Sequence, residues 1–480
     1  MPAHALPETP DSDAAARRAL RLIGPDPANW VPDRPGIDHN VFIVGGGQTG
    51  CALAYALRRA GIGKVAVIDA AADGAGSGIW RDTARMHLLR TPKALVGPEL
   101  GLPDLGFRAW YEARHGEAAY AALDRIPRPD WAAYLAWFRA FLAIPVRYGT
   151  RLLGIAPRAG GFTLRLAGPR GIAHETARKI ILATGFAGAG RPLVPEVLTR
   201  ALPATRYAHT DAPIDFTALR GKVVAVIGAA ASAFDAAGVA LEQGAARVHL
   251  FARRAEIAAL PVTRARGYPG AYDNYFDLPD ALRWRLALRF RQAGSTPTAD
   301  AIERAVAHAN FQLHLAAPWE AARMEGEHVV ARVGGQDVRC DFVIAGTGYA
   351  AEPAAREELA AIAPHIRLWR DAYTPPEQEA DAALGAHPYL GAGHEYLEKT
   401  QGAAPWLGDI HVQNPSGFVS FGLPTGDVPS MKRDLPAIVA RISRDLFLAD
   451  LAAHERRMQA AVAPDFPADL YAPAVRPVAG

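Results

Sequence analysis

Two segments of this chain each combine a hydrophobic strand, a tight turn of small residues and a helix, and this repeated pattern constrains the fold most. The first lies at residues 41–57 and contains the turn Gly45-Gly46-Gly47-Gln48-Thr49-Gly50. The second lies at residues 223–237 and contains the turn Gly228-Ala229-Ala230-Ala231-Ser232-Ala233. In such a turn the amino terminus of the following helix points toward the pyrophosphate of a dinucleotide, and small residues let that anion approach the backbone. We therefore expect an α/β protein with two Rossmann-like dinucleotide-binding domains.

The residues that follow the next strand distinguish the two expected dinucleotides. After the first turn, the strand at residues 65–68 is followed by Asp69, whose carboxylate can accept hydrogen bonds from ribose hydroxyls but would repel a 2′-phosphate. This pattern predicts FAD or NAD. After the second turn, the strand at residues 248–251 is followed by Arg253 and Arg254, and paired guanidiniums suit a phosphate dianion. This pattern predicts NADPH.

Length, composition and cysteine content limit the class of protein. A chain of 480 residues, half of them hydrophobic and 21% charged, can bury the cores of two or three domains. The net charge of +3 is too small to indicate nucleic acid or an anionic membrane as a partner. Cys51 and Cys340 are far apart in the sequence, which disfavours a redox-active thiol pair, and we predict no metal site. Neither a secretory signal nor a membrane-spanning segment is evident, so we expect a cytoplasmic protein.

The order of the patterns predicts that one domain is inserted in the other. We expect an amino-terminal arm laid over the surface at residues 1–38, because this segment is rich in proline, aspartate and alanine. The first dinucleotide-binding domain then takes residues 39–200, and the second takes residues 201–340. Residues 341–480 are expected to return to the first domain and to end in helices.

Two similar strands end in a Thr-Gly pair, at residues 179–185 and 341–349. Strands buried on both faces fit a parallel sheet, and small residues at their ends leave room for a ligand. We therefore expect Thr184, Gly185, Thr347 and Gly348 to contact the cofactors. The alternative is that Thr-Gly merely ends each strand.

These motifs, taken together, resemble the two-dinucleotide (class B) flavoprotein monooxygenases, which include flavin-containing, Baeyer–Villiger and N-hydroxylating enzymes. The resemblance rests on the two turns, on both Thr-Gly strands, and on the segments Gly76-Ser77-Gly78-Ile79-Trp80 and Leu89-Arg90-Thr91-Pro92-Lys93. It implies that FAD and NADPH are the cofactors, with the NADPH domain inserted in the FAD domain. It also implies that NADPH reduces FAD, that a flavin C4a-(hydro)peroxide forms with molecular oxygen, and that a small organic substrate is oxygenated. The Baeyer–Villiger signature is incomplete around His209, so we expect oxygenation at a nitrogen or sulfur.

The expected cofactor-binding residues combine the motifs with this resemblance. They are Gly45, Gly47, Gln48, Thr49, Gly50, Asp69, Trp80, Thr91, Thr184, Gly185, Gly228, Ala230, Ser232, Ala233, Arg253, Arg254, Thr347 and Gly348. Trp80 is expected to lie against the flavin, although it could equally anchor a glycine-rich loop. The turn at residues 426–429, before a helical run at 435–448, suits either the flavin edge or a simple helix cap, and we favour the cap.

The candidate catalytic residues are His209 and Arg264. Arg264 belongs to a segment at residues 261–275 that mixes cations with aromatic side chains and could contact substrate or nicotinamide; alternatively, it is a solvated surface charge. His209 also suits a domain-linking or cofactor-orienting role. Two other functions remain open: a flavin reductase or oxidase that passes electrons to a quinone or protein partner, and a non-catalytic binding protein on the same fold. The oligomeric state is not predicted.

Overall fold

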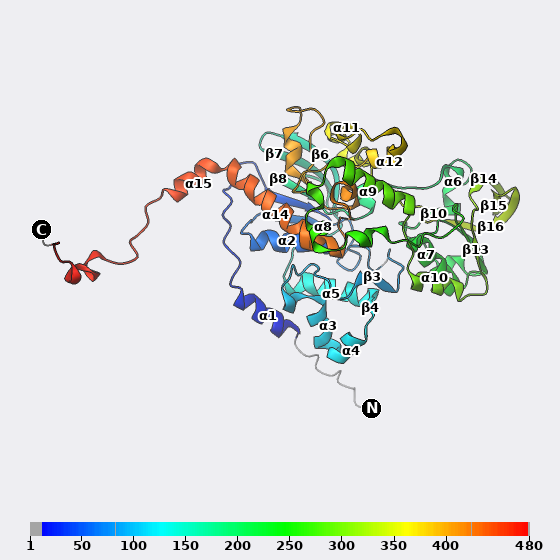
Figure 1. Ribbon diagram of the computed structural model, residues 1–480, viewed down its shortest axis with the longest axis horizontal. Helices are drawn as coiled ribbons and strands as arrows, with labels where there is room; N and C mark the ends of the chain where they lie inside the picture. Colours follow the sequence, from blue (N-terminus) through cyan, green and yellow to red (C-terminus); the bar gives the residue numbers. More distant parts are fainter. Residues whose placement is uncertain (1–11, 82, 424, 479–480) are drawn as a thin grey trace.

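The computed structural model describes residues 12–81, 83–423 and 425–478, which form a larger body, a smaller body and an extended carboxyl-terminal tail (Figure 1). The larger body is built on a seven-stranded sheet with the order β5-β2-β1-β8-β7-β6, to which β19 adds beside β8. These strands are β1 His39–Val44, β2 Val65–Ile68, β5 Val146–Arg147, β6 Arg151–Arg158, β7 Gly161–Gly168, β8 Gly171–Leu182 and β19 Ile410–Val412. Strands β1, β2, β5, β8 and β19 pair in parallel, so their carboxyl ends meet at one edge.

Helices cover this first sheet. Helix α2 (Gln48–Arg59) follows the first glycine turn and packs against α14 (Val428–Ala449) in a core of aliphatic side chains from both helices and β1. A second core, rich in aromatic rings, joins α3 (Phe107–His115), α4 (Glu117–Ala122) and α5 (Arg128–Phe141). A short antiparallel pair, β3 (Leu88–Pro92) and β4 (Arg125–Pro127), lies next to these helices.

The smaller body contains a five-stranded parallel sheet with the order β10-β17-β11-β12-β13. Its strands are β10 Tyr207–His209, β11 Val223–Ile227, β12 Arg247–Phe251, β13 Phe311–His314 and β17 Phe342–Ala345. Helices α7 (Ala231–Glu242) and α10 (Ala299–Val306) pack on one face. An antiparallel sheet of β14 (Trp319–Glu325), β15 (His328–Val333) and β16 (Gln336–Cys340) contributes to the core on the other.

The return of β19 to the first sheet, after the whole second sheet, confirms the nested arrangement of two dinucleotide-binding folds. The predicted boundary after residue 340 is wrong for one strand, because β17 pairs with β10 and β11 and so belongs to the second sheet. A short apolar strand has the same pattern in either sheet, and the sequence does not reveal its neighbours. Other short elements are α6 Glu196–Thr199, β9 Arg191–Pro192, β18 Tyr349–Ala350 and α15 Leu451–Met458.

A second departure from the predicted domains is the segment 262–293, which leaves the second sheet and packs against the first body. It contains α8 (Pro269–Asp273) and α9 (Asp280–Ala293), and α8 lies beside the start of α14 (Figure 1). The buried Trp284 of α9 packs with residues of α11 (Trp369–Ala372), α12 (Ala382–Gly385) and α13 (Phe418–Phe421). Residues that follow the second turn therefore contribute to the first body.

The amino-terminal segment also differs from the expected surface arm, because its described part contains a packed helix, α1 (Ser12–Leu22). Ala16 of this helix is fully buried in the aromatic core, and the Trp137 indole nitrogen donates to Asp13 at 2.7 Å. The alanines of α1 favour a helix, and their small side chains permit close packing. These effects outweigh the loop-like composition of the rest of residues 1–38. No helix among the described residues is long and apolar enough to cross a membrane.

Candidate functional site

The first glycine turn lies where the carboxyl ends of β1, β8 and β19 meet. Gly45 has φ +109°, and a Cβ added to it would lie 2.2 Å from the carbonyl oxygen of Ala183. A Cβ on Gly50 would lie 1.8 Å from the carbonyl oxygen of Gly45. Both positions therefore require glycine, and they hold the start of α2 tightly against the turn.

A cavity of about 230 Å³ opens beside this turn, and its lining includes Gly47, Gln48, Trp80, Arg81 and Arg139. Gly47 is the residue before α2 and gives the helix no side-chain cap, so the first amide groups of α2 need another acceptor. An anion at a helix amino terminus supplies one. With two guanidiniums on the same cavity, the donor set fits the pyrophosphate of a dinucleotide. The sequence did not reveal these two arginines because they come from a loop and from the last turn of α5, outside any motif.

The Asp69 carboxylate organises the turn itself. Its Oδ2 accepts from the Gly46 amide at 2.8 Å and from the Ser77 hydroxyl at 2.9 Å, and its Oδ1 accepts from the Ala71 amide. The side chain is thus at the expected place, at the end of β2 beside the turn. Its role in reading a ribose stays a prediction.

Gln48 joins the turn to two tryptophans and to the start of α14. Its side-chain carbonyl accepts from the indole nitrogens of Trp80 at 3.0 Å and Trp131 at 3.1 Å. Its amide nitrogen lies 3.4 Å from the carbonyl oxygen of Gly426, which also accepts from the Thr49 hydroxyl. Trp80 is therefore both an anchor of the glycine-rich loop and part of the cavity wall, so the two alternatives raised by the sequence are compatible.

At the far side of the site, β8 and β19 place Thr184 and Asn414 together. The Asn414 side-chain amide donates to the Thr184 hydroxyl at 3.1 Å, and both residues directly follow the sheet edge. Gly185 follows in a left-handed conformation with φ +62° and open space around it. Asn414 was missed because its strand is only three residues long, although the Asn-Pro pair at residues 414–415 is a turn signal.

Asp427 caps α14, as favoured from the sequence. Its Oδ1 accepts from the Ser430 amide at 2.9 Å. Burial is the main cause that raises the pKa of Asp427 to about 7, and the nearby Asp434 acts in the same direction. A carboxyl group with such a pKa can be protonated or ionised near neutrality.

The second turn, at residues 228–233, has alanines at positions where the first turn has glycines. Gly228 has φ +117°, and a Cβ there would lie 2.2 Å from the Gly346 carbonyl oxygen. Ala230 precedes α7, whose first turn also lacks a side-chain cap, and Ala233 packs directly beneath Gly346. Ser232 is exposed at the start of α7. The helix amino terminus is thus available to an anion here too.

The two arginines predicted to bind a 2′-phosphate have different surroundings. Arg253 is exposed just after β12. Arg254 is half-buried, and its guanidinium donates to the carbonyl oxygens of Ala293 and Arg291 at 2.8 and 3.2 Å. Arg254 therefore holds the end of α9, while Arg253 is the better placed of the two for a phosphate.

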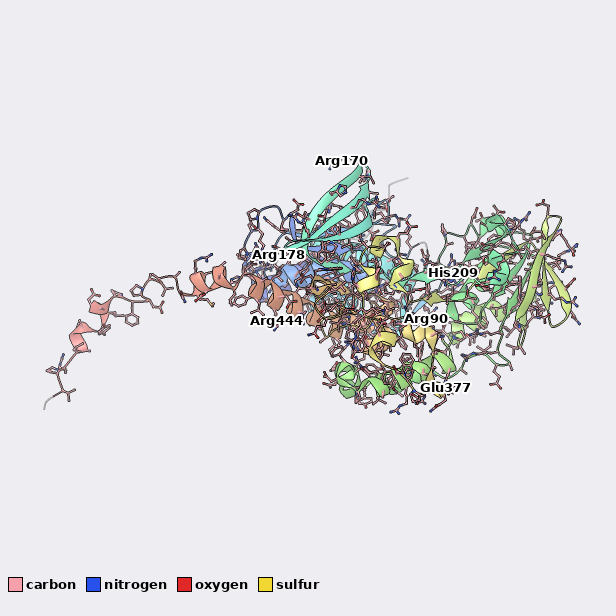
Figure 2. All side chains as sticks on the ribbon, turned by 90° about the horizontal axis from the view of Figure 1, so that it is seen from above. Arg90, Arg170, Arg178, His209, Glu377 and Arg444 are labelled. Carbon is pink, nitrogen blue, oxygen red and sulfur yellow. The ribbon has the colours of Figure 1, made fainter. Side chains whose placement is uncertain are left out.

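His209 lies between the two bodies, as Figure 2 shows, and both of its ring nitrogens have backbone partners. Nδ1 accepts from the Asp211 amide at 3.1 Å, and Nε2 donates to the Gly348 carbonyl oxygen at 3.0 Å. The residue is buried, and burial lowers its pKa, so the neutral imidazole is favoured. Both ring nitrogens are thus engaged with the backbone, and the catalytic and domain-linking roles of His209 stay predictions.

The remaining predicted residues are Thr347, Gly348, Thr91 and Arg264. Thr347 donates its hydroxyl proton to the Leu193 carbonyl oxygen, and Gly348 has φ +81°. Thr91 is half-buried on β3. Arg264 is exposed. These cofactor and catalytic assignments stay predictions.

The segment 262–277 reaches the start of α14 and so approaches the first site from the second domain. The Tyr272 hydroxyl donates to the Pro429 carbonyl oxygen, and the Arg433 guanidinium donates to the backbone carbonyl of Tyr272 at 3.3 Å. The ring of Tyr275 lies so close to Gly422 that a Cβ there would be 2.3 Å from it.

Comparisons with known proteins agree with this architecture. A family model described as pyridine nucleotide-disulphide oxidoreductase matches residues 42–265. The FAD-dependent urate hydroxylase of Xanthomonas campestris pv. campestris is 43% identical over 424 residues, which are 88% of this chain and 89% of that protein. Ornithine hydroxylase (PvdA) from Pseudomonas aeruginosa superposes with a TM-score of 0.66 at 18% identity, covering 85% of this chain and all of that one. L-lysine 6-monooxygenase from Pseudomonas syringae superposes with a TM-score of 0.65 at 17% identity, covering 85% of this chain and 99% of that one. The two structures share the fold.

Proposed function

Because this chain belongs to the flavoprotein monooxygenase family that includes the Xanthomonas urate hydroxylase, we propose that it hydroxylates urate or a closely related oxopurine with FAD, NADPH and molecular oxygen. The observation that carries this proposal is the 43% identity, which extends over 88% of this chain and 89% of the relative.

The residues of the site fit the two cofactors. The first turn of α2, Arg81 and Arg139 would hold the FAD pyrophosphate, and Trp80 would lie along the cofactor. The second turn and Arg253 would hold NADPH. Bound FAD supplies a redox centre that accepts hydride from NADPH and activates oxygen. The protein's own task is to hold both nucleotides, to position the substrate and to exclude water.

Thiol chemistry is disfavoured by the state of the two cysteines. Cys51 and Cys340 are both buried, and burial raises the pKa of each to about 12, so neither is a reactive thiolate near neutrality. Cys51 lies on α2 and Cys340 on β16, in different bodies. Electrons would therefore go to oxygen, or, in the alternative reductase function, to a quinone or protein partner.

The test is NADPH oxidation by the purified flavoprotein with urate, other oxopurines, amines and sulfides, with hydrogen peroxide release measured alongside. The proposal predicts that urate or a related oxopurine accelerates NADPH oxidation, is consumed in equal amount, and lowers peroxide release. Faster oxidation with an amine or sulfide alone would replace the purine by the nitrogen or sulfur substrates expected at first. Oxidation that responds only to quinones would support the reductase.

A further inference from the structure

The side chain of Arg266 is a buried cation without a matching anion. Four arginine or lysine residues are buried in the described part of the chain, and Arg266, at 7% exposure, is one of them. The other three have carboxylate partners: Arg178 with Asp450 at 2.7 Å, Lys179 with Asp445 at 3.0 Å, and Arg283 with Asp280 at 2.5 Å. Arg266 has no carboxylate within 4.0 Å among the described residues.

The contacts of Arg266 do not replace a counter-charge. Its Nη1 lies 3.4 Å from the Tyr275 hydroxyl, and its guanidinium lies over the Tyr275 ring, 5.6 Å from the centroid. Burial lowers the pKa of Arg266, and the nearby guanidinium of Arg289 has the same effect. A buried charge is costly unless it is paired, so a cation kept in this environment indicates that an anion completes the site.

The position of Arg266 connects it to the proposed active site. It lies in the segment 262–277, in which Tyr275 packs on Gly422 and Tyr272 binds the Pro429 carbonyl at the start of α14. That same helix start faces the first glycine turn through the contact of Gln48 with Gly426. Leu260 and Tyr268, six and two residues from Arg266 in the sequence, are 71% and 61% exposed, so this segment carries exposed apolar side chains.

We propose that Arg266 is a specificity residue that binds the negative charge of an anionic oxopurine, with urate as the substrate. This inference rests on the proposed function. Urate is a monoanion in neutral solution, with its charge spread over a planar ring edge. A guanidinium presents planar paired donors to such an edge, and the aromatic ring of Tyr275 holds the guanidinium in a fixed plane.

The experiment compares the flavin-loaded wild-type protein with Arg266→Gln, Arg266→Lys and the matched control Arg285→Gln. Arg285 is an exposed arginine on α9 that lies outside the proposed site. Urate is the anionic probe, and hypoxanthine, which is uncharged at neutral pH, is the neutral probe. Affinity is measured from the change in flavin absorbance on titration, and the melting temperature is measured with and without each probe.

We expect Arg266→Gln to weaken urate binding roughly 10–100-fold, the range for a hydrogen bond to a charged group, and to change hypoxanthine binding little. Arg266→Lys should recover part of the loss, and Arg285→Gln should match the wild type. Without ligand, Arg266→Gln should melt at a higher temperature, because it removes an unpaired buried charge. Unchanged urate affinity in Arg266→Gln, together with a lower melting temperature, would show a structural role and overturn the inference. Failure of the wild type to bind or oxidise urate or any related oxopurine would instead overturn the proposed function.

Discussion

The guanidinium of Arg90 lies 3.2 Å from the carboxylate of Asp235, and this ion pair joins β3 of the first domain to α7 of the second. Asp235 is buried, and burial raises its pKa despite the attraction of Arg90 and Arg304. Figure 2 shows both Arg90 and His209 between the two bodies. The pair therefore connects the helix that follows the second turn to the body that carries the first turn.

Replacing Arg90 by Gln should impair the use of NADPH more than the stability of the protein. Arg90 is 41% exposed, so the pair is expected to contribute under about 1 kcal/mol to stability. Its loss frees the start of α7, and we expect slower flavin reduction by NADPH in stopped-flow mixing. Arg170→Gln, at an exposed tip of the first sheet in Figure 2, is the control. Equal reduction rates in the two variants would exclude a role for the pair in positioning the nucleotide.

Gly50→Ala should prevent FAD from binding. The added Cβ would lie 1.8 Å from the Gly45 carbonyl oxygen, so the turn that faces the pyrophosphate must open. The measurement is the flavin content of the purified protein, read from its visible spectrum. Gly408→Ala is the matched control, because nothing lies within 4 Å of a Cβ at that position. A yellow Gly50→Ala protein with full flavin content would place the cofactor elsewhere.

Arg253→Ala should weaken NADPH binding far more than NADH binding, by roughly 1–3 kcal/mol, the value of a charged hydrogen bond to phosphate. Arg254→Ala serves as the comparison. Its guanidinium is bound to the carbonyls of Ala293 and Arg291, so its loss should lower the melting temperature with less effect on nucleotide choice. Michaelis constants for both nucleotides test this, and equal losses for NADPH and NADH in Arg253→Ala would refute the assignment.

Asp427→Asn should change how stability depends on pH. The pKa of Asp427 is raised from 3.8 to about 7, so the folded protein binds this proton more tightly than the unfolded chain. Binding of this proton stabilises the folded protein fully below about pH 4, and the stabilisation is lost as the pH rises through 7. The full contribution to the free energy of unfolding is up to about 4 kcal/mol. Asparagine also caps helices well and does not ionise. We therefore expect the variant to gain stability relative to the wild type between pH 5 and pH 8, measured by melting temperature. A constant difference across that range would contradict the shift.

Local patterns in the sequence were enough to predict both nucleotide turns, the position of Asp69 and the cap at Asp427, because each depends on residues close together in the chain. The partners of β17 and the docking of α9 on Trp369 depend on contacts between distant segments, which periodicity does not encode. The burial of Arg266 was invisible for the same reason. Its neighbour Arg264 has the same residue type in the same segment and is exposed.

The excursion of residues 262–293 onto the first body has a mechanical consequence. Two domains joined only by peptide linkers could rotate by bending those linkers. Here a second connection exists, because an anchor of buried side chains around Trp284 and Trp369 holds the inserted domain against the first body. Any swing of the nucleotide domain must therefore pivot about that anchor, and a fragment cut out at the linkers would expose the anchor's apolar surface and be prone to aggregate.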